Sequence, residues 1–109
     1  MIDISKIDYQ SFDNPMITRS LFYPRPEIGS SPAGGSAESI LIPVEEGVVV
    51  GARFHRAGME AANMLFFHGN GEIVADYNDM AVLYTDIGIN FIPVDYRGYG
   101  LSTGRPTVT

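Results

Sequence analysis

The segment 62–95 constrains the fold more than any other part of the chain, because its pattern changes from strand to helix and back to strand. Residues 62–67 (ANMLFF) form an apolar run without alternation, which is typical of a strand covered on both faces. Residues 90–95 (NFIPVD) predict a second strand, although Pro93 cannot donate a ladder hydrogen bond. With a helix between them, these strands predict a right-handed crossover unit that joins two parallel strands.

The helix of this unit is predicted by an apolar stripe. Its members are spaced 4, 3, 4 and 3 residues apart and are Ile73, Tyr77, Met80, Tyr84 and Ile87. The opposite side carries Asp76, Asp79 and Asp86. Gly88 is a suitable helix end, because glycine readily adopts the left-handed conformation found there. We therefore expect one helix over residues 73–87, with the stripe packed in the core.

Residues 39–55 predict an antiparallel hairpin. The strands 39–44 (SILIPV) and 48–55 (VVVGARFH) are joined by a short turn ending at Gly47, and so short a link requires antiparallel strands. The preceding residues contain no long periodic segment, and 29–36 has the composition of a loop. We expect an N-terminal extension over 1–38, mostly loop, and an α/β portion over 39–109.

Composition narrows the classes of function. With 109 residues, of which 45% are hydrophobic, the chain can fold as one small domain. A net charge of -6 with scattered basic residues disfavours nucleic-acid binding. The absence of cysteine excludes disulfides, thiolate catalysis and cysteine-ligated zinc. The N-terminus lacks a signal-peptide pattern and no apolar stretch approaches a membrane span, so we expect a soluble, cytoplasmic protein without membrane contact.

The stretch 100–104 (GLSTG) matches the G-x-S-x-G pattern of a serine hydrolase's nucleophile elbow. An elbow serine lies between a strand and a helix, whereas the residues on both sides of GLSTG have the composition of loops. No Asp, Glu or His follows Ser102 to supply the acid and the base. We therefore expect Ser102 to lie in a loop and not to act as a nucleophile.

The loop 68–72 (HGNGE) is the strongest candidate for a binding or catalytic site. The first N–H groups of a helix are unpaired and carry partial positive charge, and glycines allow a ligand to come close. Such a loop suits a phosphate or an oxyanion that forms during acyl transfer. In the phosphate alternative, Gly69 and Gly71 begin a dinucleotide fingerprint and Asp95 binds a ribose, but Val74 occupies the third glycine position.

Four segments together resemble the N-terminal part of the α/β-hydrolase superfamily, especially its serine aminopeptidase (S33-like) and BEM46-like members. In family order they are 22–27 (FYPRPE), 40–55 (ILIPVEEGVVVGARFH), 64–72 (MLFFHGNGE) and 89–106 (INFIPVDYRGYGLSTGRP). The resemblance implies a partial α/β-hydrolase sheet of strands one to four, truncated before the nucleophile elbow. It places Ser102 in the loop after the fourth strand. The intact relative would hydrolyse a small ester, amide or thioester without a cofactor.

The resemblance also implies half of an oxyanion hole. The backbone N–H of Asn70 would donate to the oxyanion and Gly71 would flank it, while the second donor follows the missing nucleophile. His68 is expected to fix the loop rather than to transfer protons. Asp95 and Arg97 would brace the loop or be surface charges. The two histidines are thirteen residues apart with no motif acid between them, so we expect no metal site.

Two other functions remain open. One is a nucleotide-binding module that uses Gly69, Gly71 and Asp95, and the other is a non-catalytic interaction protein that retains the first half of the fold. In the family, a fifth strand pairs with the third, and no residues here correspond to it. The strand 64–67 (MLFF) would then present an unpaired apolar edge, through which we expect the chain to self-associate.

Overall fold

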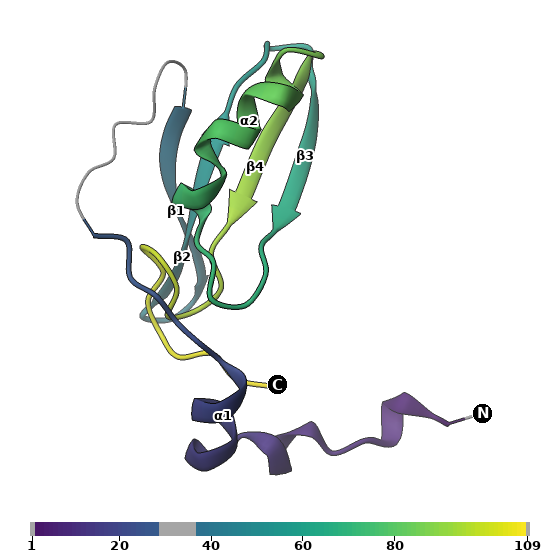
Figure 1. Cartoon of the computed structure of the whole chain (residues 1–109). Coiled ribbons are helices and arrows are strands. Elements are labelled where there is room, and N and C mark those ends of the chain that lie inside the picture. The colour runs from purple at the N-terminus through teal and green to yellow at the C-terminus, as the bar shows by residue number, and fades with distance from the viewer. Residues whose placement is uncertain (1, 29–36, 109) are drawn as a thin grey trace.

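The computed structural model describes residues 2–28 and 37–108, which contain a four-stranded mixed sheet (Figure 1). Its strands are β1 (Ala37–Glu45), β2 (Val48–His55), β3 (Ala62–Phe67) and β4 (Ile89–Val94). They lie in the order β1-β2-β4-β3; β2 is antiparallel to β1 and β4, whereas β3 and β4 are parallel. The predicted α/β class, an antiparallel hairpin followed by a parallel strand–helix–strand unit, is confirmed.

The described part of residues 1–38 holds short helical segments that were not predicted. They are η1 (Ile4–Lys6), η2 (Tyr9–Phe12) and α1 (Pro15–Leu21). Each begins after a side chain that accepts a hydrogen bond from a backbone N–H two residues later, and these caps are Asp3, Asp8 and Asn14. None of the three segments buries a residue, so they show no core-facing stripe to detect. The predicted loop 29–36 lies outside the described residues.

The single helix predicted between β3 and β4 consists of two parts, η3 (Val74–Tyr77) and α2 (Asn78–Thr85). Their buried residues are Val74 and Ala81, which lie beside the predicted stripe. Ile87 was expected in the core and is 71% exposed, so this prediction is wrong. Since α2 ends at Thr85, Ile87 belongs to the turn that closes at Gly88 (φ 82°) and no longer follows the helical period.

The core lies between this helical segment and one face of the sheet. Phe91 of β4 is fully buried there. Its ring centroid lies 4.8 Å from that of Tyr84 in α2 and 5.3 Å from that of Phe66 in β3. The ring of Tyr77 packs on Phe66 at 4.7 Å, which continues the aromatic cluster to the carboxyl end of β3. The position of the loop after β3 is therefore set by aromatic packing.

Pro93 is accommodated in the central strand β4 because of the direction in which its nitrogen points. The N–H of Asp95 donates to the Gly51 carbonyl (2.8 Å), and alternate residues of a strand point the same way, so the Pro93 nitrogen also faces β2. On that side the ladder is reduced to two bridge pairs, Ala52 with Val94 and His55 with Phe91. The ladder with β3 is continuous. The missing N–H of Pro93 therefore affects the pairing of β4 with β2, which has fewer bridge pairs, and leaves the pairing with β3 intact.

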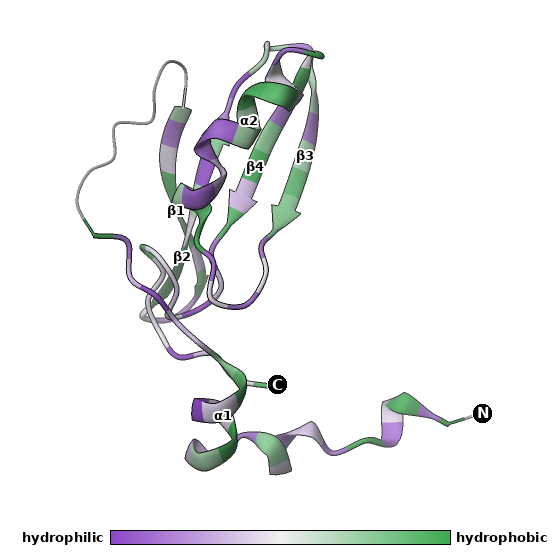
Figure 2. Ribbon diagram, viewed as in Figure 1, coloured by the Kyte–Doolittle hydropathy of each residue, from purple (hydrophilic) through white to green (hydrophobic). Residues whose placement is uncertain are grey.

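Strand β3 is an edge strand, as the resemblance implied. Within the described residues it pairs only with β4. Figure 2 shows apolar residues along most of β3. Leu65 and Phe67 are each 58% exposed, because no described element covers their face, whereas Met64 and Phe66 are half-buried. The expectation of a strand covered on both faces is therefore wrong for β3 in this chain.

The segment after β4 is a loop, as predicted, and it returns across the sheet to meet the N-terminal segment. Gly100 forms a parallel bridge with Pro26, in which its N–H donates to the Arg25 carbonyl (2.8 Å) and its carbonyl accepts from the Glu27 N–H (3.3 Å). This pairing brings residues 21–27, the loop 68–72 and the loop 95–100 to the carboxyl ends of β3 and β4 (Figure 1). No helix among the described residues has the length and hydropathy to cross a bilayer.

Candidate functional site

The loop 68–72 lies where the sequence predicted it, between the end of β3 and the beginning of η3. Gly71 adopts a left-handed conformation (φ 82°) that turns the chain toward η3. Within the described residues, the backbone N–H groups of Asn70 and Gly71 donate to no acceptor, whereas the N–H of Glu72 donates to the Gly69 carbonyl (3.2 Å). The loop therefore retains two backbone donors for a ligand.

His68 fixes the base of this loop, as expected. Its ring is buried, with Nδ1 2.8 Å from the Gly69 carbonyl oxygen and Nε2 3.0 Å from Asp95 Oδ1. A carbonyl oxygen can only accept, so Nδ1 donates to Gly69 and Nε2 faces the carboxyl group. The ring also packs edge-on against Tyr96, at 4.6 Å between centroids. With both ring nitrogens engaged, His68 holds the loop to the end of β4.

Asp95 is fully buried and ties the loop to the helical segment. Its Oδ1 accepts from the Val74 N–H (3.0 Å) as well as facing His68 Nε2. Burial raises the pKa of this carboxyl group, and the Val74 N–H and His68 oppose that rise. A Cβ at Gly100 would lie 2.0 Å from Asp95 Oδ2, so only glycine fits there. Asp95 thus braces the loop.

Arg97 braces a different part of the molecule. Its Nη1 donates to Glu45 Oε1 (2.8 Å), and both side chains are partly exposed. This ion pair joins the segment after β4 to the end of β1, so the expected contribution of Arg97 to the loop 68–72 is not observed.

Glu72 occupies the first donor of the loop. Its Oε2 accepts from the Gly69 N–H (2.6 Å) and from the Tyr77 hydroxyl (2.5 Å). These two hydrogen bonds lower the pKa of Glu72, the Tyr77 bond most, and the bond to Glu72 raises the pKa of Tyr77 to about 12. The Gly69 N–H is taken by Glu72 and is not available to a phosphate, and buried Asp95 cannot reach a ribose. Both observations disfavour the dinucleotide alternative.

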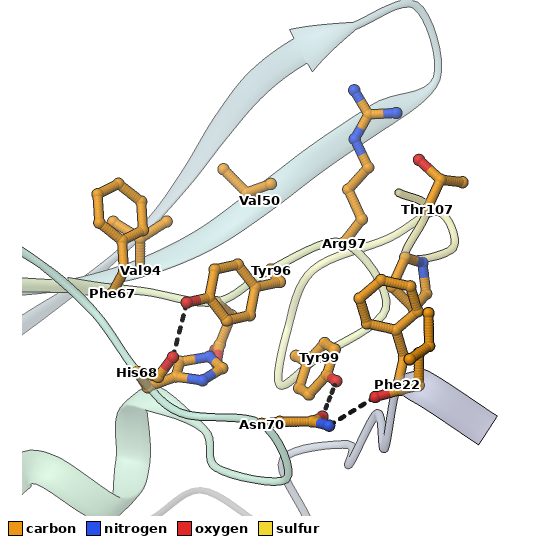
Figure 3. A pocket seen from close by; sticks show the side chains of 13 residues that line it. Phe22, Val50, Phe67, His68, Asn70, Val94, Tyr96, Arg97, Tyr99 and Thr107 are labelled. Atoms are coloured by element: carbon orange, nitrogen blue, oxygen red, sulfur yellow. Dashed lines mark hydrogen bonds and ion pairs between the residues drawn. The ribbon is translucent and has the colours of Figure 1, made fainter. Parts of the chain in front are cut away.

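The side chain of Asn70 connects the loop to two distant segments, a role that no sequence pattern predicted. Its Nδ2 donates to the Leu21 carbonyl (2.6 Å), and its Oδ1 accepts from the Tyr23 N–H (3.0 Å) and the Tyr99 hydroxyl (2.6 Å). Figure 3 shows this side chain between Tyr99 and the N-terminal segment. The carboxamide therefore fixes where the backbone of Asn70 lies.

A cavity of about 590 Å³ opens beside Asn70. Its size is in the range of small-molecule sites. The apolar part of its wall comprises Leu21, Phe22, Val50, Phe67, Val94 and Pro106. Its polar lining includes Asn70, Tyr96, Arg97 and Thr107 (Figure 3). The arrangement can hold an apolar group against the sheet with a polar end near the loop.

Ser102 is a structural residue. Its Oγ accepts from the Gly51 N–H (2.8 Å) and donates to the Asp95 carbonyl (3.0 Å). The hydroxyl proton and a lone pair are therefore committed to joining β2 to the end of β4. This confirms the prediction that Ser102 lies in a loop, and it gives the serine of GLSTG a structural reason.

The described residues provide no group of three His, Asp or Glu side chains arranged to hold a metal ion. His55 packs against Phe91 in the core, 6.0 Å between ring centroids. Burial, together with the nearby charge of Arg53, lowers the pKa of His55. Its position is that of a core histidine.

The fold is similar to that of an esterase from Pyrococcus furiosus (Pf2001), solved in two crystal forms. One superposes with a TM-score of 0.56 and 18% sequence identity over 77% of this chain and 35% of the esterase chain. The other has a TM-score of 0.55 and 19% identity over 77% and 33% of the two chains. This chain thus spans about a third of the esterase's length. No family model and no curated protein matches its sequence.

Proposed function

We propose that this chain supplies the oxyanion-binding half of an ester-hydrolysing site in a serine-type α/β hydrolase. The observation that carries the proposal is the unengaged N–H group of Asn70, a residue that lines an apolar cavity, followed by the unengaged N–H group of Gly71. They follow a parallel strand in a fold similar to an esterase's. The serine aminopeptidase-like and BEM46-like assignment belongs to this proposal and rests on the sequence motifs. A cytoplasmic location belongs to it as well, since a chain without cysteine fits a reducing compartment.

The loop would act on the carbonyl oxygen of the substrate. As a nucleophile attacks, that oxygen becomes an oxyanion, and preorganised N–H donors stabilise it more than the ground-state carbonyl. One such donor contributes about 3–4 kcal/mol to lowering the barrier. The Asn70 N–H would be the donor, and the left-handed Gly71 that follows it turns the chain toward η3.

Attack on the carbonyl requires a group that the described residues do not offer. Ser102 is engaged in two hydrogen bonds, and both nitrogens of His68 are engaged as well. The nucleophile, its base and the second oxyanion donor would therefore come from elsewhere, and the chain alone is expected to be inactive. Its contribution is substrate binding and one part of oxyanion stabilisation.

The substrate class follows from the cavity. Its wall beside the loop is apolar, formed by Phe22, Val50 and Phe67 among others, so an apolar acyl or alcohol group would bind there. An ester, amide or thioester presents the same carbonyl oxygen to the Asn70 N–H, and the sheet geometry favours none of the three. We therefore assign a small ester, amide or thioester with an apolar substituent.

A ligand titration followed by NMR tests this assignment. Hexanoate carries both an apolar chain and carboxylate oxygens that can accept from the loop. We expect saturable shifts of the Asn70 and Gly71 amide resonances and of the Val50 methyl groups. Hexan-1-ol is the control and should move Val50 but leave the two amides unchanged. Hexanoate that moves neither amide would refute the oxyanion role.

A further inference from the structure

The Asn70 side chain pairs with the backbone of another segment as a strand would. It donates to the Leu21 carbonyl (2.6 Å) and accepts from the Tyr23 N–H (3.0 Å). The residue between them, Phe22, is extended (φ −108°, ψ 135°), so these two backbone groups lie on the same edge of the segment. One carboxamide thus satisfies a donor and an acceptor that would otherwise need a neighbouring strand.

The Tyr99 hydroxyl also contacts this carboxamide and the segment it holds. It donates to Asn70 Oδ1 (2.6 Å), the same oxygen that accepts from the Tyr23 N–H. It also accepts from Tyr23 N–H at 3.1 Å. The Tyr23 N–H can only donate and the Leu21 carbonyl can only accept, so the oxygen of the carboxamide faces Tyr23 and its nitrogen faces Leu21, and the hydroxyl donates to that oxygen. Since Tyr99 is buried, this arrangement is built into the core.

The segment held by Asn70 forms part of the cavity wall. Leu21 and Phe22 line the cavity together with Asn70 and His68. Leu21 ends α1, a seven-residue helix without a buried residue, and a helix so short is not stable by itself. On the far side of α1, the Asp13 carboxylate accepts from the Val108 N–H (2.6 Å). Among the described residues, the hydrogen bonds that join Leu21–Tyr23 to the sheet and its loops come from the Asn70 side chain and the Tyr99 hydroxyl.

We propose that Asn70 is a positioning residue as well as a backbone donor: its carboxamide seats Leu21–Tyr23 as a wall of the cavity. Because the carboxamide that holds the wall and the donating N–H both belong to Asn70, the apolar wall and this N–H keep a fixed separation. Arg25 adds to the coupling, since its Nη1 donates to the Gly71 carbonyl (3.3 Å). The relevance of the wall to a substrate rests on the proposed function, but its seating can be measured without any ligand.

Two substitutions separate the hydrogen bonds from the volume of the side chain. Asn70→Ala removes both bonds to Leu21 and Tyr23. Asn70→Asp keeps the shape and the acceptor, but an ionised carboxylate cannot donate to the Leu21 carbonyl. When it is protonated, its O–H can donate again, so seating in this variant should depend on pH near the ordinary Asp pKa of about 3.9. The unmodified chain has no such dependence at this position.

Backbone hydrogen exchange in the full chain provides the measurement. The N–H groups of Thr18 and Phe22, which donate to Asn14 and Thr18 carbonyls within α1, report seating. The Asp95 N–H, bonded to Gly51, reports the sheet. In Asn70→Ala we expect protection at Phe22 to fall about tenfold or more while Asp95 changes less than about twofold. Asn70→Asp should show the same loss of protection at Phe22 at pH 7 and should regain most of that protection at about pH 3.5.

Asn63→Ala is the matched control. Asn63 lies in β3, its Oδ1 accepts from Asn90 Nδ2 (2.9 Å), and its replacement should leave Phe22 exchange unchanged. If Asn70→Ala also lowers the protection of the Asp95 N–H, Tyr99→Phe replaces it as the test. In that variant we expect the protection of the Phe22 N–H to fall about threefold.

The proposal is overturned if the exchange of the Phe22 N–H is unchanged in Asn70→Ala, or in Tyr99→Phe where that variant replaces it as the test. It is also overturned if the loss of protection in Asn70→Asp persists at low pH. Hexanoate that fails to shift the loop amides would instead refute the proposed function and leave the seating intact.

Discussion

Replacing Gly100 by alanine tests whether the buried carboxyl group of Asp95 organises the site. Gly100 has φ +55°, and a Cβ there would lie 2.0 Å from Asp95 Oδ2 and 2.5 Å from its Cγ. The carboxyl group is fully buried, and its Oδ1 is held by His68 and the Val74 N–H. The methyl group must therefore displace Asp95 and break its hydrogen bonds.

The magnitude follows from two contributions. The left-handed backbone at Gly100 costs alanine about 1–2 kcal/mol. Loss of the two hydrogen bonds that Asp95 makes leaves buried groups without partners and adds about 1–3 kcal/mol each. Their sum, about 3–8 kcal/mol, is comparable to the whole free energy of unfolding of a small domain. We expect Gly100→Ala to abolish cooperative unfolding or to lower Tm by more than about 20 °C.

Two glycines provide matched controls for a thermal melt followed by circular dichroism. Gly47 has φ +75° and nothing within 4 Å of the position that a methyl group would take, so Gly47→Ala should show only the backbone cost, about 5–10 °C in Tm. Gly58 has neither a positive φ nor a neighbour within 4 Å, so Gly58→Ala should melt like the unmodified chain. A Gly100→Ala variant that melts within a few degrees of Gly47→Ala would refute the reasoning.

Four further predictions concern separate parts of the chain. Ser102 should not be labelled by a fluorophosphonate probe, because its hydroxyl is engaged twice; stoichiometric labelling would contradict this. In a hydrolase relative that carries this loop, Asn70→Pro should lower kcat about a hundredfold or more by removing the N–H donor, and unchanged turnover in a folded variant would exclude the role. Since burial raises the pKa of Asp95, the stability it contributes is present below its ordinary pKa and is lost as pH rises through the folded-state pKa. We therefore expect the free energy of unfolding in urea to fall, relative to that of Asp95→Asn, between about pH 4 and pH 7. A difference between the two free energies that does not depend on pH would contradict this prediction. The chain is expected to self-associate through the β3 edge at about micromolar concentration. Leu65 is 58% exposed, so Leu65→Lys would place a charge on this edge and should reduce self-association in a sedimentation experiment. An unmodified chain that sediments as a monomer would contradict this prediction.

Local patterns in the sequence predicted the elements of the sheet. β2 and β3 begin and end at the predicted residues, and the hairpin turn closes at Gly47 with the positive φ that glycine permits. β4 was found despite Pro93, since its flanking residues are apolar. These features depend on neighbours a few residues away, so they can be recognised without knowing the rest of the fold.

Features that depend on which surfaces meet were predicted less well. Ile87 continues the helical spacing but lies past the end of α2, and its exposure follows from where the chain turns. The apolar composition of β3 suggested cover on both faces, yet whether a face is covered depends on elements elsewhere in the chain. α1 buries no residue, so no periodic stripe could predict it.

The candidate site divides in the same way. That a glycine-containing loop follows β3 could be predicted from the sequence, because strand, glycines and helix are adjacent along the chain. The resemblance implied that Asp95 could brace this loop, but the pairs that hold it became known from the folded structure: His68 meets Asp95 across 27 residues, and Asn70 meets Leu21 across 49. A hydrogen bond between residues so far apart requires two loops to return to the same end of the sheet. That return is set by the strand order and by packing of the whole chain, and no short sequence pattern encodes it.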